Sequence, residues 1–131
     1  MKEIIVSGKK YQYQDTIKGR NALDLDRKVT SVFLSLDFKS NEVNLKEIVP
    51  LLCSYMGNID DRLFEDLVYR TLNGVVVVGD EKTKSFSFSG ENIYSYFFGK
   101  LNEMYELLIE VWDAAGLTVF QWARALEAKP Q

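Results

Sequence analysis

The strongest constraint on the fold of this chain is a run of apolar and aromatic residues in its last third. The members of this run recur at three- and four-residue steps, which places them on one face of a helix. They are Ile93, Tyr94, Phe97, Phe98, Leu101, Met104, Tyr105, Leu108, Val111, Trp112 and Ala115. Because so much apolar surface has to be covered, the rest of the chain must supply elements that pack against it.

Two glycines divide this apolar run into separate helices. Gly99 lies inside the run, where a glycine in a helix interior costs about 1 kcal/mol relative to alanine, and Gly116 follows its last member. We therefore predict a short helix near 91–98, a longer helix near 100–115 and a last helix from 117 to about 128. Most of the apolar run then belongs to a hydrophobic core.

The chain begins with the two-residue period of β-strands. Apolar residues at 4–6 lead to Ser7-Gly8, and two tyrosines then alternate with glutamines at 11–14, which predicts an antiparallel hairpin at about 2–14. A second hairpin is expected at about 75–88. There, four valines precede the turn residues Gly79–Lys82 and an alternating Ser-Phe-Ser-Phe segment. This order is compatible with pairing between the two hairpins.

The middle of the chain predicts three helices. The first runs from about 20 to 37, where apolar residues step at helical intervals, and a polar connector follows at 38–43. The third helix is capped by Asp60 or Asp61 and stopped by Asn73-Gly74.

The second of these helices is predicted to begin at Asn44. Asn44 and Glu47 have the spacing of a capping box, in which each side chain accepts from a free backbone amide. Pro50 should kink or delay the helix, and Gly57-Asn58 should end it. The whole chain is thus predicted to form a single α+β domain over 1–131. It is predominantly helical, with four to six helices and one or two small antiparallel hairpins.

Composition argues against common catalytic and metal sites. The chain has no histidine, and its one cysteine, Cys53, lies in an apolar segment where it is expected to act as a small buried hydrophobic residue. The glycines do not have the spacing of a phosphate-binding loop, and no serine has a histidine to activate it. We therefore predict no enzymatic activity, no catalytic residues, no cofactor and no metal.

Targeting and membrane signals are also missing from the sequence. The apolar segment at 4–6 is too short for the core of a secretory signal, and no stretch approaches the roughly 20 apolar residues that span a bilayer. We expect a soluble protein of a reducing compartment with no membrane partner.

Four acidic residues form a stripe on another face of the longest predicted C-terminal helix. They are Glu103, Glu106, Glu110 and Asp113. Such a stripe is typical of a solvated helix face, and the leading functional interpretation is an interface for a basic partner. A divalent cation site is a further alternative, although calcium usually takes its oxygen ligands from loops.

A tryptophan near the C-terminus completes the candidate binding residues. Trp112 and Phe120 lie in the apolar pattern and are expected in the core, whereas Trp122 falls out of phase with its neighbours. Trp122 is therefore expected to be exposed and to contact a partner.

Nucleic-acid binding is not expected. The net charge is −3, and the basic residues that lie closest together, Lys9, Lys10, Lys18 and Arg20, are interrupted by acidic residues.

The order of these features resembles the tail assembly chaperones of long-tailed bacteriophages. The resemblance covers most of the chain, from about Tyr11 to Leu126. It rests on the segment Lys18–Leu23 that opens the first helix, on the helix ended by Asn73-Gly74, and on the run Tyr96–Leu101 that leads into Tyr105–Val111.

This resemblance implies a binding protein with a role in virus assembly. It implies that the chain binds the tape-measure protein, assists assembly of the tail-tube protein, acts in the host cytoplasm and is absent from the mature virion. Self-association is a further expectation, because a protein that covers a long rod gains affinity by binding in many copies. The alternatives are a structural head-tail or tail-tube component that stays in the virion, and an acidic protein-binding or cation-binding module.

Overall fold

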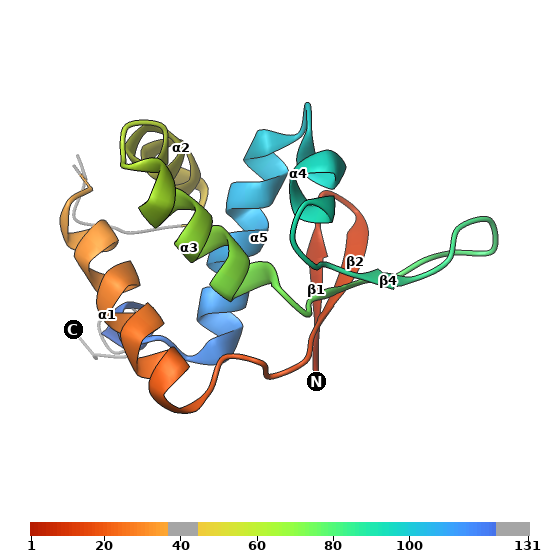
Figure 1. The fold of residues 1–131 in the computed structure, drawn as a ribbon, viewed down its shortest axis with the longest axis horizontal. Coiled ribbons are helices and arrows are strands. Elements are labelled where there is room, and N and C mark those ends of the chain that lie inside the picture. The colour runs from red at the N-terminus through yellow and green to blue at the C-terminus, as the bar shows by residue number, and fades with distance from the viewer. Residues whose placement is uncertain (37–44, 123–131) are drawn as a thin grey trace, which may run out of the picture.

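The computed structural model describes residues 1–36 and 45–122 and confirms a predominantly helical α+β fold (Figure 1). In chain order the elements are β1 (Lys2–Val6), β2 (Lys9–Tyr13), α1 (Gly19–Leu34), α2 (Leu45–Met56), α3 (Asp61–Leu72), β3 (Val76–Val77), β4 (Phe86–Ser87), α4 (Asn92–Phe97) and α5 (Leu101–Ala115). A further helical segment occupies 118–122, at the end of the described chain.

Both predicted hairpins are present, and they pair with each other in one antiparallel sheet of order β1-β2-β3-β4. Tyr11 of β2 is the register partner of Ile4 on one side and of Val77 on the other. The β1–β2 turn places Ser7 at φ 51° and Gly8 at φ 79°. Two successive residues with positive φ are the requirement of a type I′ turn, whose twist matches that of the flanking strands. The Ser7-Gly8 dipeptide therefore sets the register of the first hairpin.

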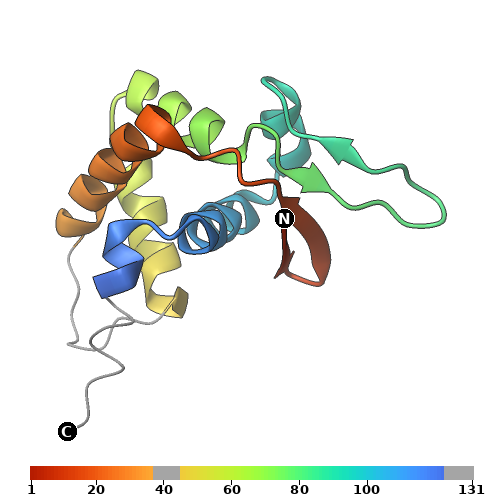
Figure 2. The ribbon, with the colours of Figure 1, turned by 90° about the horizontal axis from the view of Figure 1, so that it is seen from below.

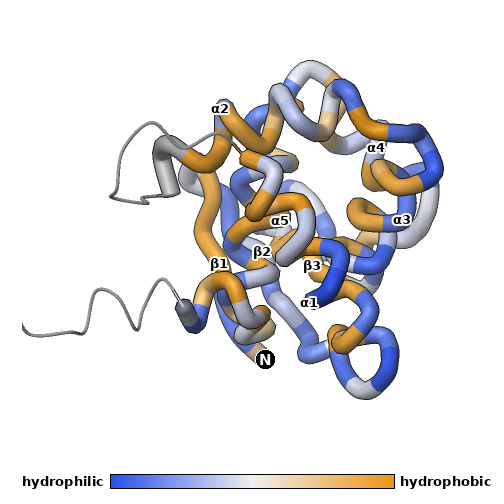
Figure 3. The backbone as a smooth tube through the Cα atoms, turned by 90° about the vertical axis from the view of Figure 1, so that its left-hand side faces the viewer, coloured by the Kyte–Doolittle hydropathy of each residue, from blue (hydrophilic) through white to orange (hydrophobic). Residues whose placement is uncertain are grey.

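Helix α5 lies at the centre of the structure. It packs against α2 and α3 on one side and β1 on the other, with α4 near its start (Figures 1 and 2). Its buried residues are Met104, Tyr105, Leu107, Leu108, Ile109, Val111 and Trp112. Hydrophobic and hydrophilic residues alternate along the surrounding helices (Figure 3), so each helix has an apolar side available for packing.

Ion pairs join α1 to α3 at the edge of this core. The Lys28 ammonium lies 2.7 Å from an Asp66 carboxylate oxygen and 3.3 Å from one of Asp24. Arg70 donates to both carboxylates, which joins two acidic and two basic side chains in a ring, and Arg27 also pairs with Asp24. The four side chains of the ring are about 70% buried, which shields their attraction from solvent more than at an open surface.

The helix ends follow the predicted capping residues. Asp60 accepts a hydrogen bond of 2.8 Å from the backbone N–H of Arg62 and so caps α3. Gly116 adopts the left-handed conformation at φ 76° and ends α5, while Gly99, at φ 79°, separates α4 from α5. The helix breaks predicted at Gly99 and Gly116 are therefore confirmed.

Several details differ from the sequence prediction. Pro50 lies inside α2, which begins at Leu45, so the proline does not delay the helix. Phe98 and Leu101, assigned to the buried run, are 89% and 47% exposed, because the turn at Gly99 directs this corner outward. Leu117 precedes the last helical segment instead of opening it.

Some predictions lie outside the described residues. These are the connector at 38–43, the capping role of Asn44 and the last helix beyond 122.

A buried hydrogen bond connects α5 to α3. Trp112 Nε1–H donates to Thr71 Oγ1 at 2.7 Å, and both residues are fully buried. Thr71 is a buried polar residue of the described core, and its hydroxyl is needed there as the acceptor for the Trp112 indole N–H. An unsatisfied N–H in such a position would lose its hydrogen bond without gaining one from water.

The substitution Thr71→Val should therefore destabilise the protein. Valine has nearly the same shape but leaves the Trp112 N–H without an acceptor, which should lower the free energy of unfolding by about 1–3 kcal/mol. Urea denaturation followed by circular dichroism measures this change. The control is Thr16→Val at an exposed threonine, which should change stability by less than about 0.5 kcal/mol. Equal stability of the two variants would contradict the role given to this hydrogen bond.

Candidate partner-binding surface

The four acidic residues predicted as one stripe lie on one side of α5, but the structure places them in different surroundings. All four are half-buried, so they do not form a freely solvated helix face. Glu106 and Glu110 line a pocket beside β1, and Glu103 lies one turn earlier, close to the start of the helix. Asp113 lies in the last turn of α5, where it interacts electrostatically with Glu110.

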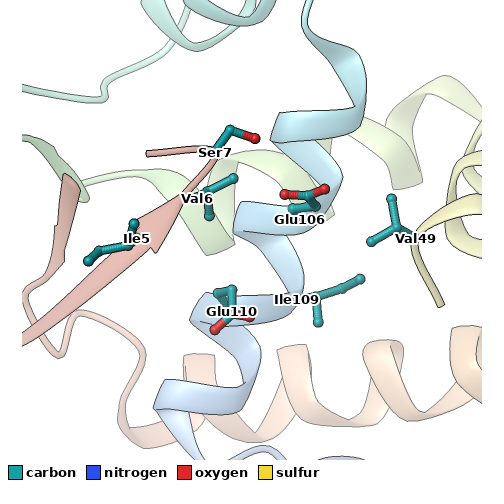
Figure 4. Close-up of a pocket in the computed structure, with 7 residues that line it drawn as sticks. All are labelled: Ile5, Val6, Ser7, Val49, Glu106, Ile109 and Glu110. Atoms are coloured by element: carbon teal, nitrogen blue, oxygen red, sulfur yellow. The ribbon is translucent and has the colours of Figure 1, made fainter. Parts of the chain in front are cut away.

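We call the pocket beside β1 the acidic groove. Its walls come from three elements that are distant in the sequence: β1 and the turn after it, α2, and α5 (Figure 4). Ile5, Val6, Ser7, Val49, Glu106, Ile109 and Glu110 line it. Its volume of about 240 Å³ lies below the roughly 300–1,000 Å³ that is typical of small-molecule sites. The groove therefore suits one or a few side chains of a protein partner better than a cofactor.

The chemistry of the acidic groove combines apolar walls with two carboxylates. Ile5 is 60% exposed, and its side chain lies on the side of β1 away from α5 (Figure 4), whereas Val6 points toward the helix and Ile109 is buried. Glu106 and Glu110 are one helical turn apart and both line the groove, so both carboxylates can contact the same face of a ligand (Figure 4). This arrangement fits an aliphatic anchor flanked by Lys or Arg side chains.

Electrostatics in the acidic groove favour the arrival of positive charge. Burial raises the pKa of Glu110, and the nearby Asp113 and Glu106 carboxylates raise it further. The ionised form of Glu110 is thus disfavoured in the folded protein by desolvation and by like charges. A cationic partner would relieve this repulsion.

Glu103 belongs to a different cluster. It lies in the first turn of α5, where a negative charge interacts favourably with the helix dipole. It also interacts electrostatically with Lys9 and Lys100. Its buried Oε2 atom has no hydrogen-bond partner among the described residues. The predicted stripe is therefore divided, with Glu103 next to lysines and Glu106 and Glu110 in the acidic groove.

The predicted exposure of Trp122 agrees with the structure. Trp122 is 51% exposed, whereas Trp112 is fully buried and Phe120 nearly so. Trp112 and Phe120 both pack edge-to-face against Phe33 of α1, with ring centroids 6.1 Å and 5.4 Å away. Cys53 is a free thiol, half-buried against the core.

The basic residues that lie closest together in the sequence are also separated by the fold. Lys9 and Lys10 line a pocket between the two hairpins, together with Lys84. Arg20 instead lines a shallow pocket with Asp24 and Arg70, at the end of the α1–α3 ion-pair network.

Metal clusters and membrane-spanning helices are the remaining kinds of site to consider. Over 1–36 and 45–122, no three acidic or cysteine side chains are grouped so that they could hold a metal ion. Within the same ranges, no helix combines the length and the apolar character needed to cross a bilayer.

Comparison with protein families matches residues 8–114 to the family described as phage tail assembly chaperone protein. The chain belongs to this family. The match includes β2, the three helices that follow it, the second hairpin, α4 and almost all of α5, so it spans most of the elements that enclose the core. Four of the seven residues that line the acidic groove of this chaperone lie inside the matched region, and Ile5, Val6 and Ser7 lie just before it. Comparisons with curated proteins and with solved structures gave no match.

The residues of the groove show what sequence reasoning missed in this chaperone. Glu106 and Glu110 were recognised from their spacing on α5, but Ile5 and Val49 gave no signal of their own. Ile5 looks like any residue of a strand, and Val49 like any apolar residue of a helix. Their contribution depends on the packing of β1 and α2 against α5.

The raised pKa of Glu110 predicts a pH-dependent effect of the substitution Glu110→Gln. A carboxyl whose pKa is raised by folding destabilises the folded state when it is ionised, so removing the charge should stabilise the chaperone at neutral pH. Because the side chain is half-exposed, we expect a gain below about 1 kcal/mol. The gain should disappear as the pH falls below the ordinary glutamate value of 4.5, where both forms are uncharged.

Urea denaturation at a series of pH values measures this difference. Glu65→Gln, at an exposed position of α3, is the matched control and should show no comparable gain at neutral pH. A destabilised Glu110→Gln variant at neutral pH would contradict the unfavourable setting of this carboxylate.

Proposed function

We propose that this chaperone binds the tape-measure protein in the host cytoplasm, keeps it soluble, and assists assembly of the tail-tube protein around it. Membership of the tail assembly chaperone family supports a role in tail assembly. The tape-measure protein is a long and mostly helical chain, so its chaperone needs an accessible surface that can hold an amphipathic helix. Release of the chaperone before the virion is complete is part of the proposal.

The observation that carries this proposal is the acidic groove. Apolar residues from β1, α2 and α5 form its walls, and Glu106 and Glu110 add negative charge at a spacing of one helical turn. An amphipathic helix presents aliphatic and charged residues at the same spacing. The proposed partner segment therefore inserts an aliphatic side chain and places Lys or Arg one turn away. We propose Glu106 and Glu110 as its main polar contacts.

The other acidic residues and Trp122 have supporting roles in this proposal. Asp113 adds negative charge beside Glu110, and Glu103 extends the acidic side of α5 toward the start of the helix. Trp122 offers an exposed aromatic anchor beyond the C-terminal end of α5. Each of these contacts is individually weak, and self-association of the chaperone along the tape-measure protein would combine many of them.

Coexpression tests the function and the groove separately. A tape-measure fragment produced with the chaperone should appear in the soluble fraction in larger amounts than when it is produced alone. The double variant Glu106→Gln/Glu110→Gln keeps the side-chain shape but removes both charges, and should weaken binding about five- to tenfold. Glu65→Gln is the matched control on α3. Purified fragment and chaperone, titrated by calorimetry, give the affinities.

The outcomes distinguish the two parts of the proposal. Equal solubility of the fragment with and without the chaperone would contradict tape-measure binding. Improved solubility that the double variant retains in full would leave the function standing and move the binding site away from the acidic groove. Mass spectrometry of purified virions addresses release, because a structural component of the head-tail junction or the tail tube would be found there in stoichiometric amounts.

Trp122 provides a spectroscopic measurement of the same complex. Of the two tryptophans, Trp112 is buried and Trp122 is half-exposed, so acrylamide quenching of the free chaperone should arise mainly from Trp122. Binding of a tryptophan-free tape-measure fragment should shift its emission to shorter wavelength and reduce quenching, and Trp122→Phe should abolish both changes. If Trp122 remains equally quenched in a saturated complex, it takes no part in binding.

A further inference from the structure

A second pocket lies between the two hairpins, on the other side of the Ser7-Gly8 turn from the acidic groove. Gly8, Lys9 and Lys10 form one wall, residues of the second hairpin form the other, and Tyr96 of α4 closes the end. Its volume is about 510 Å³. The second hairpin projects away from the body of the molecule (Figures 1 and 2). We call this second pocket the lysine pocket.

Two lysine side chains meet on one aromatic ring at the base of the lysine pocket. The Lys100 amine lies 3.9 Å from the centre of the Tyr96 ring, and the Lys9 amine lies 5.3 Å from it. Burial lowers the pKa of Lys100, and the neighbouring Lys9 lowers it further, whereas the interaction with Lys100 raises the pKa of Lys9. An anion bound beside these amines would favour the charged form of Lys100 and would therefore be stabilising.

The carboxylates around the lysine pocket leave much of its positive charge uncompensated. Among the described residues, no ion pair joins Lys9, Lys10 or Lys84 to a carboxylate. Glu103 interacts electrostatically with both Lys9 and Lys100. Asp80 is engaged in its own loop, where its Oδ1 accepts from the backbone N–H groups of residues 82 and 83.

The projecting loop is held in shape by its own contacts. The Gly79 N–H donates to Ser85 Oγ at 2.8 Å. A Cβ atom at Gly79 would lie 2.1 Å from the carbonyl oxygen of Thr83, so only glycine fits where the two arms of the loop meet. Together with the Asp80 turn, these contacts fix the backbone that carries Lys84. A ligand that binds Lys84 would therefore lose less affinity to ordering of the loop backbone.

We propose that the lysine pocket binds an acidic segment of a protein partner, with carboxylates between Lys9 and Lys84 and an apolar side chain against Phe86 and Tyr96. Phe86 is 39% exposed beside the Tyr96 ring, at a centroid distance of 5.8 Å, and provides the apolar part of the surface. This site is separate from the acidic groove, and its occupant has the opposite charge.

The surroundings of the lysine pocket favour an acidic peptide over a nucleic acid. A phosphate backbone gains affinity by contact with an extended basic surface, which releases many counterions. Here Asp80 lines the pocket, Glu81 is exposed on the same loop, Glu103 interacts with Lys9 and Lys100, and the whole chain carries a net charge of −3. A short segment with a few carboxylates can form ion pairs with the lysines without coming into contact with these acidic groups.

Fluorescence anisotropy with the full chain tests this proposal. The probe is a fluorescein-labelled peptide of Asp, Glu and Phe residues, compared with the same peptide carrying Asn and Gln. The acidic peptide should bind more tightly by about tenfold or more at low salt, and added salt should reduce the difference. The double variant Lys9→Gln/Lys84→Gln should weaken binding about five- to tenfold. Lys18→Gln, at an exposed lysine outside the pocket, is the matched control and should bind as the unaltered chain does.

Three results would overturn the proposal. The first is equal binding of the acidic and the neutral peptide, and the second is an equal loss of affinity in Lys18→Gln. The third is tighter binding of a labelled oligothymidylate than of the acidic peptide, which would assign the pocket to nucleic acid. If thermal melting shows that the double variant is unfolded, Lys84→Gln alone replaces it, since this exposed residue lies on the projecting loop.

Discussion

The burial of α5 is the constraint on which the other elements of this chaperone depend. Seven of its fifteen residues are buried, and they include the adjacent residues Leu107, Leu108 and Ile109, which point in three different directions around the helix. A helix buried on so many sides must be enclosed. Helices α2 and α3, strand β1 and helix α4 all pack against it. Only a narrow polar side remains, and the acidic residues of α5 lie on that side.

The positions of the helices and hairpins could be predicted because their signals are local. Gly99 and Gly116 adopt the positive φ angles that glycine permits, and the breaks in the apolar run fall at these two residues. The Ser7-Gly8 turn and the cap at Asp60 likewise depend on the chemistry of a few neighbouring residues. Local chemistry of this kind is present in the sequence itself, so the order of elements and the α+β class followed from it.

The burial of individual side chains and the acidic groove depend on tertiary packing, which the helical period does not contain. Leu107 and Ile109 lie off the predicted apolar face but are buried because helices cover more than one side of α5. Phe98 lies on that face but is exposed because the chain turns at Gly99. In the same way, the helical period of the sequence places Glu103 on one face with Glu106 and Glu110, although their surroundings differ in the folded protein. The lysines that separate Glu103 from them come from β2 and from the residue before α5.

The first hairpin divides the charged surfaces of the chaperone. Ser7 lines the acidic groove and Gly8, the next residue, lines the lysine pocket, so two surfaces of opposite charge lie on either side of one tight turn. A ligand of uniform charge is attracted to one surface and repelled by the other, which limits non-specific binding. Under the two proposals, a basic helical segment and an acidic segment occupy separate sites without competing. Because Ser7 and Gly8 are adjacent residues, partners bound at the two sites would lie next to each other.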